Sequence, residues 1–376
     1  MKIGLNLLYL IPEQVGGTQT YAISLLHALA GIDRSNEYYV FLNKEGASLD
    51  LQLGGNFHIV KCKFEGHSRF ARYVWEQLAL PIQLINLKID VVHSLGYVGP
   101  LLSPCPSIVT IPDINFIVLK NDMSILKRSV LRFFSTQSAI RASHVITISN
   151  FSKAELARHL KLDWLKICVT HLGSKEEMPE NCAMGWNVLK KTYSIREPYI
   201  VAFGGGALHK NIMRLIQAYC LLINEFPHQL VLMGHIPSNV DLKRIMNTWH
   251  LDGRLITTGY IPDKNMLPLL SHAELFVLPS LYEGFGLPVL EAQEAGVPVV
   301  CSSAASLPEV GGEGALYIDP TSSNDMANGI RRCLKNTDMR LSLIAKGKEN
   351  LKRFSWKKTA VQTLEVYRRV YEAAYQ

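Results

Sequence analysis

The feature that most constrains the fold is the alternation of short apolar runs with longer helical patterns. Several of these helical stretches lie between β-branched and aromatic runs, for example residues 69–87. Near-continuous apolar runs predict parallel strands that are covered on both faces. The alternation therefore predicts a doubly wound α/β domain that ends near His171. Its predicted strands are "MKIGLNLLYL", "YYVFL", "FHIVKC", "IDVVHS", "PSIVTI" and "HVITIS".

A second α/β series begins at "PYIVAFGGG" and continues through "QLVLMG", "LITTGY", "ELFVLPS", "PVVCSS" and "ALYID". The stretch between the two series, Leu172 to Glu197, is polar and rich in helix breakers. A chain of 376 residues is too long for one ordinary core. We therefore predict two Rossmann-like domains, residues 1–173 and 198–355, joined by a linker at 174–197 and followed by a final helix at 356–376.

Composition excludes some classes of protein and leaves the partner of a basic region open. The chain carries a net charge of +7, and residues 61–170 hold 14 Lys and Arg against 7 Asp and Glu, a difference of 14 − 7 = +7. This basic half could face anionic lipid, an anionic acceptor or nucleic acid, or it could be a solvated surface. The seven cysteines form no C-x-x-C pair, which argues against a disulfide framework and a zinc site. We expect a reducing cytosol. No run reaches the length of a membrane span.

Two glutamates in "PSLYEGFGLPVLEAQEAGVPVV" are the first candidate site residues. The surrounding segment, residues 265–330, has eight acidic residues and no Lys or Arg. Glu283 is predicted in a loop at the carboxyl edge of a sheet, and Glu291 early in the next helix, where open α/β sheets bind ligands. Carboxylates accept hydrogen bonds from neighbouring hydroxyls, so a sugar or ribose diol suits each of them. Alternatively, Glu291 stabilises only the helix dipole. Gly284 and Gly286 let backbone approach a ligand.

Other candidates have an ordinary structural alternative. Gly16 and Gly17 precede a helix predicted to open near Thr18, and their bare amides suit an anion, although any β–α turn looks similar. Lys210, at the start of a helix, is either a phosphate ligand or a solvated lysine. His93 ends a strand, which more often indicates a structural role.

The segment "MSILKRSVLRFFSTQSAI" mixes basic and apolar residues. It fits either a helix on a membrane surface or a helix that covers the sheet.

The blocks of sequence, in this order, resemble the retaining, nucleotide-sugar-dependent glycosyltransferases of family 4, which have the GT-B fold. "EGFGLPVLE" is similar to their Glu-x7-Glu signature, and "VGGTQTYAISLLHAL" to their amino-terminal Gly-Gly loop and helix. "HKNIMRLIQAY" resembles their donor-phosphate helix, and "FSWKKTAVQTLEVY" their last helix. The resemblance covers nearly the whole chain. It implies two Rossmann-like domains facing across a cleft, with residues 356–376 packing back on the first domain.

The resemblance also implies roles for individual residues. Glu291 would bind the ribose and Glu283 the sugar, while Lys210 and the Gly16–Gly17 loop would stabilise the departing diphosphate. Catalytic roles are expected for Glu283, Lys210 and Asp113, and an acceptor-side position for Asp113 and His93. The donor would further contact His209, Gly284, Phe285, Gly286 and Leu287.

The sequence departs from the family pattern at two positions. His209 stands where relatives often have Arg, and imidazole is a weaker phosphate ligand than guanidinium. Pro112 stands where many relatives have a His, so a side-chain donor is missing there, while the following Asp113 is kept and can still meet the acceptor. The alternative for Asp113 is a carboxylate at a turn or helix start.

The expected activity is transfer of a hexose, with mannose the best guess, from GDP-mannose or a UDP-sugar to a glycan acceptor that is lipid-linked. The sequence shows no Asp-x-Asp and no metal-ligand spacing, so we expect no metal and no cofactor apart from the nucleotide-sugar co-substrate. We expect a cytoplasmic protein, in peripheral contact with the anionic inner face of the plasma membrane through its basic first domain, and no nucleic-acid partner.

Two other functions stay open. An NAD-dependent oxidoreductase needs a G-x-G-x-x-G spacing that "FGGGALHKN" does not provide. A non-catalytic scaffold that binds glycan or a polyanion is compatible with the changes at Pro112 and His209.

Overall fold

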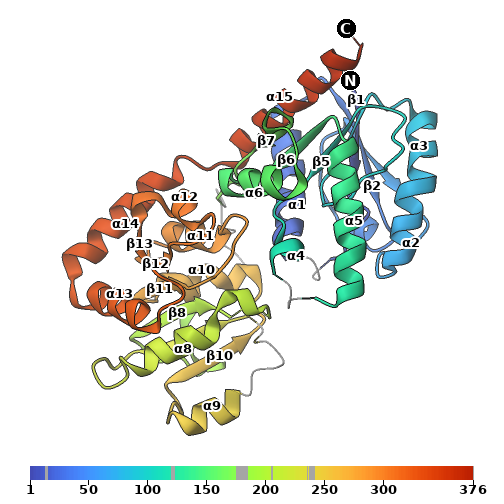
Figure 1. The fold of residues 1–376 in the computed structure, drawn as a ribbon. Coiled ribbons are helices and arrows are strands. Elements are labelled where there is room, and N and C mark those ends of the chain that lie inside the picture. Colours follow the sequence, from blue (N-terminus) through green and yellow to red (C-terminus); the bar gives the residue numbers. More distant parts are fainter. Residues whose placement is uncertain are drawn as a thin grey trace. The chain divides into compact units, whose positions relative to one another are not determined.

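The structure, a computed structural model, describes residues 1–12, 16–119, 123–174, 185–204, 206–234, 236 and 242–375. The chain divides into two compact units (Figure 1). The first contains Met1–Gly173 and Phe354–Gln376, and the second contains Ser174–Arg353. Each unit is a parallel sheet with helices around it, so the expected pair of doubly wound α/β domains is confirmed.

The first unit is built on a seven-stranded parallel sheet in the order β3-β2-β1-β4-β5-β6-β7. Six of the strands coincide with predicted apolar runs. The seventh, β7, was not predicted, because its three residues are too short to show a pattern. The strands are β1 (Lys2–Asn6), β2 (Glu37–Leu42), β3 (Phe57–Lys61), β4 (Val91–Ser94), β5 (Ser107–Thr110), β6 (His144–Thr147) and β7 (Ile167–Val169).

The helices of the first unit come from both ends of the chain. Tyr21 of α1 and Trp356 of α15 pack with ring centroids 6.5 Å apart, so the last helix of the chain lies beside the first (Figure 1). The helix predicted at residues 69–87 is present, but its middle is a π-helical turn, η2. The elements are α1 (Gly16–Ile32), α2 (Arg69–Val74), η2 (Trp75–Ala79), α3 (Leu80–Leu87), α4 (Asn115–Val118), α5 (Ile125–Arg141), α6 (Asn150–Leu160) and α15 (Trp356–Tyr375).

The second unit has a six-stranded parallel sheet in the order β10-β9-β8-β11-β12-β13. Its strands are β8 (Tyr199–Phe203), β9 (Gln229–Met233), β10 (Leu255–Gly259), β11 (Leu275–Leu278), β12 (Val299–Ser302) and β13 (Ala315–Ile318). Its helices are α7 (Trp186–Thr192), α8 (Ile212–Cys220), α9 (Leu242–Thr248), α10 (Asp263–Ser271), α11 (Leu287–Glu294), α12 (Leu307–Gly311), α13 (Ser323–Lys335) and α14 (Thr337–Leu351), with 3₁₀ turns η4 (Leu208–Lys210) and η5 (Gly312–Gly314).

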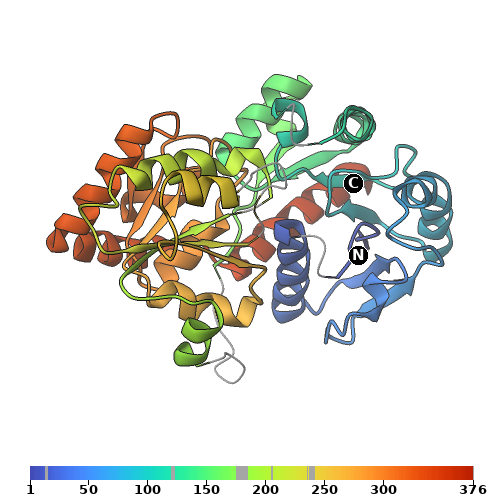
Figure 2. The ribbon, with the colours of Figure 1, turned by 90° about the horizontal axis from the view of Figure 1, so that it is seen from below.

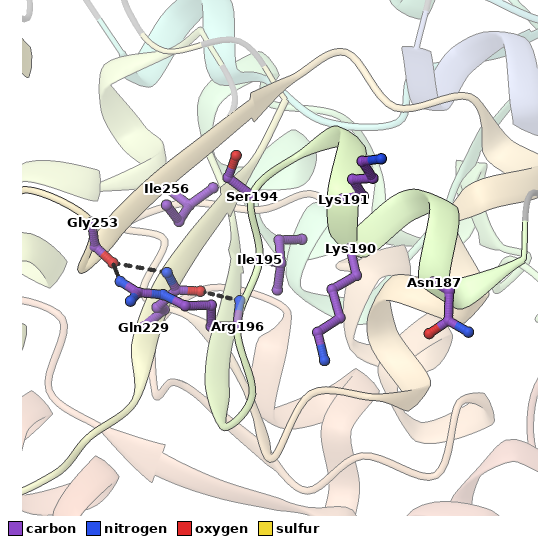
Figure 3. Close-up of a pocket in the computed structure, with 9 residues that line it drawn as sticks. All are labelled: Asn187, Lys190, Lys191, Ser194, Ile195, Arg196, Gln229, Gly253 and Ile256. Atoms are coloured by element: carbon purple, nitrogen blue, oxygen red, sulfur yellow. Dashed lines mark hydrogen bonds between the residues drawn. The ribbon is translucent and has the colours of Figure 1, made fainter.

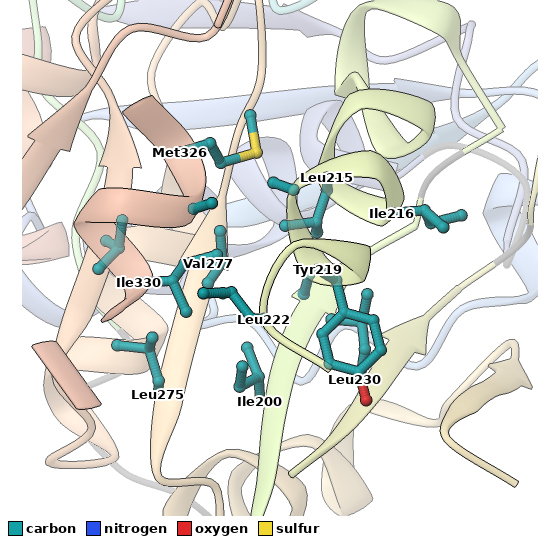
Figure 4. Close-up of a cluster of buried hydrophobic side chains, with 14 of the residues drawn as sticks. Ile200, Leu215, Ile216, Tyr219, Leu222, Leu230, Leu275, Val277, Met326 and Ile330 are labelled. Carbon is teal, nitrogen blue, oxygen red and sulfur yellow. The ribbon is translucent and has the colours of Figure 1, made fainter. Parts of the chain in front are cut away.

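Both faces of the second sheet are covered, which explains why its central strands β8 and β11 are apolar throughout. Alternate residues of a strand point to opposite faces. Ile200 and Ala202 of β8 therefore pack against α8 and α13 in one cluster (Figure 4), and Tyr199 and Val201 pack into another. Figure 2 shows helices on both sides of this sheet.

Part of the predicted linker belongs to the second unit. Residues 175–184 lie outside the described residues, but α7 follows them, and its Leu189 is fully buried in the core of that unit. The sequence pattern missed this packing because, of the described residues of the stretch, only Leu189 and Ile195 are buried in the cluster.

The strand order fixes where a ligand can enter each sheet. In an open α/β sheet, ligands bind beyond the carboxyl ends of the strands where the order reverses, because the two flanking loops diverge there. The reversal falls between β1 and β4 in the first sheet and between β8 and β11 in the second. The loops after these four strands are therefore the places to look for a site.

Candidate active site

The most pronounced polar contact at the second reversal point joins Lys210 to Glu283. Lys210 lies on η4, after β8, and Glu283 lies in the loop after β11. The Nζ of Lys210 is 2.7 Å from Oε1 of Glu283, and the two side chains are only 20% and 12% exposed. No local sequence pattern indicates this pair, because the two residues are 73 positions apart. Although residues 265–330 hold no Lys or Arg, Glu283 therefore has a cationic partner from a distant part of the chain.

Two hydrogen bonds hold the Lys210 turn against the Glu283 loop, and a third ties it to the end of β13. The backbone N–H of Leu281 donates to the carbonyl of His209 at 2.8 Å. Asn211 has a left-handed backbone with φ of 62°, which ends η4 and starts α8. Its side-chain amide donates to the carbonyls of Pro279, after β11, and Pro320, after β13, at 2.9 and 2.7 Å. The ends of three strands are thus joined through one buried side chain.

Two buried serines fix the Glu283 loop from inside. The hydroxyl of Ser280 donates to Oε1 of Glu283 at 2.6 Å. The hydroxyl of Ser306 contacts the carbonyls of Glu283 and Phe285 at 2.8 and 2.6 Å. Sequence reasoning missed Ser280, Ser306 and Asn211. Ser280 and Asn211 adjoin predicted site residues, but nothing in the sequence distinguishes them from ordinary turn residues.

The environment of Glu283 keeps its carboxyl ionised. Burial, the largest influence, acts to raise its pKa. The charge of Lys210, the hydrogen bonds from Lys210 and Ser280, and the nearby His209 act in the opposite direction and together prevail, so the pKa lies below its ordinary value. Glu283 is therefore a negative acceptor at neutral pH rather than a proton donor.

The helix that was predicted after Glu283 is present. Gly286 has φ of 113°, and α11 starts at Leu287. Gly284 and Phe285 are buried beneath this turn, and Glu291 is half-buried in the second turn of the helix. The first turn of α11 contains no acidic residue. Its amino end therefore offers backbone N–H groups and a positive dipole end beside the Glu283 loop.

In the first unit the structure places Gly16 and Gly17 in the first turn of α1, two residues before the predicted helix start. A Cβ at either position would meet no atom within 4 Å, so packing does not require glycine there. Asp113 lies after β5, where its Oδ1 accepts hydrogen bonds from Tyr97 and from the backbone of Asn115, both at 3.1 Å. The second bond fits the helix-start role that was the alternative for Asp113.

His93 does not line a ligand site, contrary to the acceptor-side expectation. It is fully buried, with Nδ1 2.7 Å from the Tyr367 hydroxyl and Nε2 2.7 Å from the Thr110 hydroxyl. Burial lowers its pKa to about 3. His93 is a neutral core residue that joins β4 and β5 to α15.

A depression of 570 Å³ lies in the second unit, at the edge of the sheet opposite to the Lys210–Glu283 pair. Figure 3 shows its lining, in which Arg196 and Gln229 both donate to the carbonyl of Gly253. Arg196 precedes β8, Gln229 begins β9 and Gly253 precedes β10, so these residues mark the amino ends of the strands. Ligands of open sheets bind at the other edge, and Lys190 beside it is paired with Glu197. We do not assign the donor to this depression.

Two further properties of the described residues concern metal ions and the membrane. Among the described residues, no group of three or more His, Cys, Asp or Glu side chains is arranged to hold a metal ion. No helix in the described part of the chain has both the length and the apolarity needed to cross a bilayer. The second reversal point offers a cation, an ionised carboxylate and a helix start without an acidic residue in its first turn. This combination suits a ligand with both phosphates and hydroxyls.

Comparison with known proteins agrees with this chemistry. Residues 15–175 match the family described as Glycosyltransferase Family 4, and residues 189–350 match Glycosyl transferases group 1. The chain is 35% identical over 236 residues to O-antigen chain mannosyltransferase B of Escherichia coli. That match covers 62% of this chain and 62% of the relative.

Solved structures share the fold over nearly the whole chain. Sucrose-phosphate synthase from Thermosynechococcus elongatus matches with a TM-score of 0.77 and 20% identity, over 99% of this chain and all of the other. HepE of Anabaena, solved in complex with UDP-glucose, matches with a TM-score of 0.74 and 19% identity, over 98% of this chain and 99% of the other. At these identities the likeness establishes the fold, GT-B.

Proposed function

Because the chain belongs to the family-4 and group-1 glycosyltransferases, we propose that it is a retaining hexosyltransferase. It moves a hexose, in our proposal mannose, from a nucleoside-diphosphate sugar to a glycan acceptor. The observation that carries this proposal is the Lys210–Glu283 pair at the reversal point of the second sheet. The similarity to an O-antigen mannosyltransferase supports mannose, and therefore GDP-mannose ahead of UDP-sugars.

The pair suggests how the donor is bound. In the unliganded protein, Lys210 and Glu283 neutralise each other. A donor diphosphate competes for Lys210, because two phosphates are stronger partners for an ammonium group than one carboxylate. Glu283 is then released toward the hydroxyls of the transferred sugar, while Glu291 binds the ribose. The amino end of α11 adds backbone donors for the phosphates.

These groups act on the charge that develops during transfer. The bond between the anomeric carbon and the phosphate oxygen breaks, the bond to the acceptor oxygen forms on the same face of the sugar, and the acceptor proton passes to the leaving phosphate. Lys210 and the helix amides stabilise the leaving diphosphate. The negative Glu283 stabilises positive charge on the sugar ring. Asp113, on the first unit, is the proposed contact of the acceptor.

The first unit also offers a surface for a membrane. Five apolar side chains along the continuous helix α2–η2–α3 are between 42% and 79% exposed: Phe70, Val74, Leu78, Ile82 and Ile85. Ile125, Leu126 and Phe133 of α5 are exposed as well, and α5 also carries Lys127 and Arg132. The stacked rings of Tyr73 and Phe134 join the two helices. We call these eight apolar side chains the apolar face, and we propose that it rests on anionic lipid, close to a lipid-linked acceptor.

The test of the main proposal is a panel of nucleotide sugars, read by donor hydrolysis and by thermal shift. We expect GDP-mannose to bind and to be hydrolysed slowly in the absence of acceptor. Glu283→Gln keeps the size of the side chain and removes its charge, so hydrolysis should fall roughly a hundredfold. GDP binding should be kept, because Lys210 is then free for the phosphates.

The control is Glu313→Gln, the same change at a side chain that is 84% exposed on η5. It should leave hydrolysis as in the wild type. A protein that binds no nucleotide sugar, or one whose hydrolysis is unaffected by Glu283→Gln, contradicts the proposal. The second outcome is what a non-catalytic scaffold predicts, and binding of NAD in place of a nucleotide sugar is what an oxidoreductase predicts.

A further inference from the structure

A cavity of 450 Å³ lies in the first unit, at the point where the order of its sheet reverses. Tyr9 and Thr18 reach it from the segments after β1, and Tyr97 from the loop after β4. Arg69, Arg72 and Tyr73 reach it from α2. We call this the α2 cavity. Its place is the one where an open α/β sheet binds its ligand, and the roles assigned so far do not use it.

The ionisable side chains with nitrogen heads that line the α2 cavity are all basic. Arg69, Arg72 and His67 line it, and no Asp or Glu is among the described residues that do so. The Arg69 guanidinium forms no hydrogen bond or ion pair with another described residue, and Nε2 of His67 lies 3.6 Å from Oε1 of Glu45. An anion is therefore the ligand that the walls attract.

Arg72 is held in place, and its Nε makes no hydrogen bond with a described residue. Its guanidinium lies over the ring of Tyr73, 4.7 Å from the centroid, and only 17% of the side chain is exposed. Its Nε is 3.7 Å from Oε2 of Glu76, which is beyond hydrogen-bonding distance. Neither atom has a hydrogen-bond partner among the described residues, although both are buried. A buried donor of this kind is costly unless a ligand satisfies it.

Glu76 lies on the π-helical turn η2 and is 1% exposed. Its other oxygen accepts a hydrogen bond from Asn6 at 3.5 Å. Burial raises the pKa of Glu76 to about 7, although Arg72 and Asn6 act to lower it. Near neutral pH this carboxyl is therefore only partly charged, and it compensates Arg72 incompletely. Such π-turns occur often at functional sites.

The remaining walls suit a sugar. The Tyr9 hydroxyl donates to the carbonyls of Thr18 and Leu95, and the Tyr97 hydroxyl donates to Asp113. Their polar tips are thus engaged, which leaves ring surface for the cavity. The Tyr9 ring lies so close to Gly96 that a Cβ there would be 2.6 Å from it. Aromatic walls with a few polar groups are typical of sites for small organic ligands.

We propose that the α2 cavity binds a phosphate group carried by the acceptor glycan, with Arg72 and Arg69 as its ligands. Guanidinium groups match phosphate oxygens in geometry as well as in charge. This inference rests on the proposed function, since it names the acceptor of the same transfer. It makes Arg72 a residue that determines acceptor specificity, and Glu76 a positioning residue beside it.

The experiment compares four acceptors with the full-length protein and saturating GDP-mannose: methyl and octyl mannosides, each with and without a phosphodiester between the sugar and the alkyl group. We expect kcat/KM to be about tenfold to a hundredfold higher with the phosphodiester, the range of a charged hydrogen bond. The advantage should appear with either alkyl chain, because Arg72 binds the phosphate. An advantage that follows only the alkyl chain overturns the inference.

Substitutions of Arg72 and Arg69 test whether these side chains cause the preference for the phosphodiester. Arg72→Gln should reduce the ratio of the two kcat/KM values to about one, and Arg72→Lys should keep part of it, because lysine retains the charge but not the planar fork. Arg69→Gln, at an exposed position, tests the same site if Arg72→Gln does not fold. Arg158→Gln, an exposed arginine on α6, should keep the full ratio.

Donor hydrolysis without acceptor distinguishes failure of the proposed glycosyltransferase function from failure of the proposed phosphate site. If GDP-mannose and the other nucleotide sugars are neither bound nor hydrolysed, the proposed function itself fails. If the donor is hydrolysed but phosphorylated and unphosphorylated acceptors are used equally well, the α2 cavity is not a phosphate site and the proposed function stands. A ratio that is unchanged in both Arg72→Gln and Arg69→Gln also overturns the inference.

Discussion

Single residues at the second reversal point have little freedom to vary, and Gly286 shows why. Its φ of 113° is a conformation that residues with a side chain rarely adopt. A Cβ at this position would also lie 2.6 Å from Cδ2 of Leu307. The turn that carries Glu283 into α11 therefore depends on glycine both for its backbone and for the space beside it.

Gly286→Ala should lower the free energy of unfolding by more than the roughly 1–3 kcal/mol of backbone strain alone. The matched control is Gly296→Ala at the other end of α11. Gly296 also has a positive φ, of 72°, but a Cβ there meets nothing within 4 Å. Urea unfolding of both variants gives the comparison. Equal losses of stability would show that the contact with Leu307 contributes nothing.

At the scale of elements, the helix α2–η2–α3 serves two surfaces at once. Its outer side carries the five exposed apolar residues of the apolar face, and its inner side carries Arg72 and the buried Glu76. The π-turn inserts one extra residue per turn, which changes the direction of the side chains that follow it. The sequence predicted the helix but not the turn, because apolar spacing alone does not distinguish the two kinds of helical turn.

Membrane contact through this helix predicts a defect in lipid binding. Replacing both Phe70 and Leu78 by Glu should weaken binding to vesicles of phosphatidylcholine and phosphatidylglycerol by more than tenfold. Each exposed side chain is worth about 1.5–3 kcal/mol when buried, and each Glu adds repulsion from the anionic lipid. Co-sedimentation with the vesicles measures this binding.

The control for lipid binding is Leu341→Glu on α14 of the second unit, where Leu341 is 59% exposed. This variant should bind the vesicles like the wild type. Wild-type binding by the double variant, or equal binding to vesicles of phosphatidylcholine alone, would argue against the apolar face as a site for anionic lipid.

At the scale of the whole molecule, the two ends of the chain form one unit, and a buried polar chain joins them. The Tyr21 hydroxyl of α1 is 3.0 Å from the Thr110 hydroxyl, which contacts His93, and His93 contacts Tyr367 of α15. All four side chains are buried. The first sheet therefore depends on a helix whose Tyr367 lies 274 residues after His93 in the chain.

This network makes the stability of the first unit sensitive to acid. Burial lowers the pKa of His93 from 6.5 to about 3, so the unfolded chain takes up a proton below pH 6.5 that the folded chain excludes. Stability is then lost as the pH falls from about 6.5 toward 3, by up to about 1.4 kcal/mol per pH unit. His93→Gln should lose less stability between pH 7.5 and pH 5 than the wild type, as measured by urea unfolding.

The control for the acid effect is His159→Gln, an exposed histidine on α6. It should follow the wild-type dependence on pH. Glu76 should act in the opposite direction, because its folded pKa of about 7 lies above its ordinary value of 4.5. The folded chain holds this proton more tightly, so that contribution to stability is lost as the pH rises from about 4.5 to 7. If His93→Gln and the wild type show the same slope, His93 does not stay neutral in the folded protein.

The order of apolar runs along the chain was sufficient to predict two parallel α/β sheets, because strand and helix periods are local properties of sequence. Twelve of the thirteen strands coincide with predicted runs. The loop with Glu283 and the start of α11 also followed from nearby glycines and prolines. In the same way, the likeness to a family of glycosyltransferases followed from short blocks of sequence.

Pairings across the fold had to come from the tertiary structure. Lys210 and Glu283 are 73 residues apart, and His93 and Tyr367 are 274 apart, so no local pattern links them. Strand order decides such contacts. It places β8 beside β11, so that the loops after these two strands lie together. Burial then decides the chemistry. It leaves His93 neutral in the core, while Glu283 at the sheet edge keeps its charge because a distant lysine and a buried serine reach it.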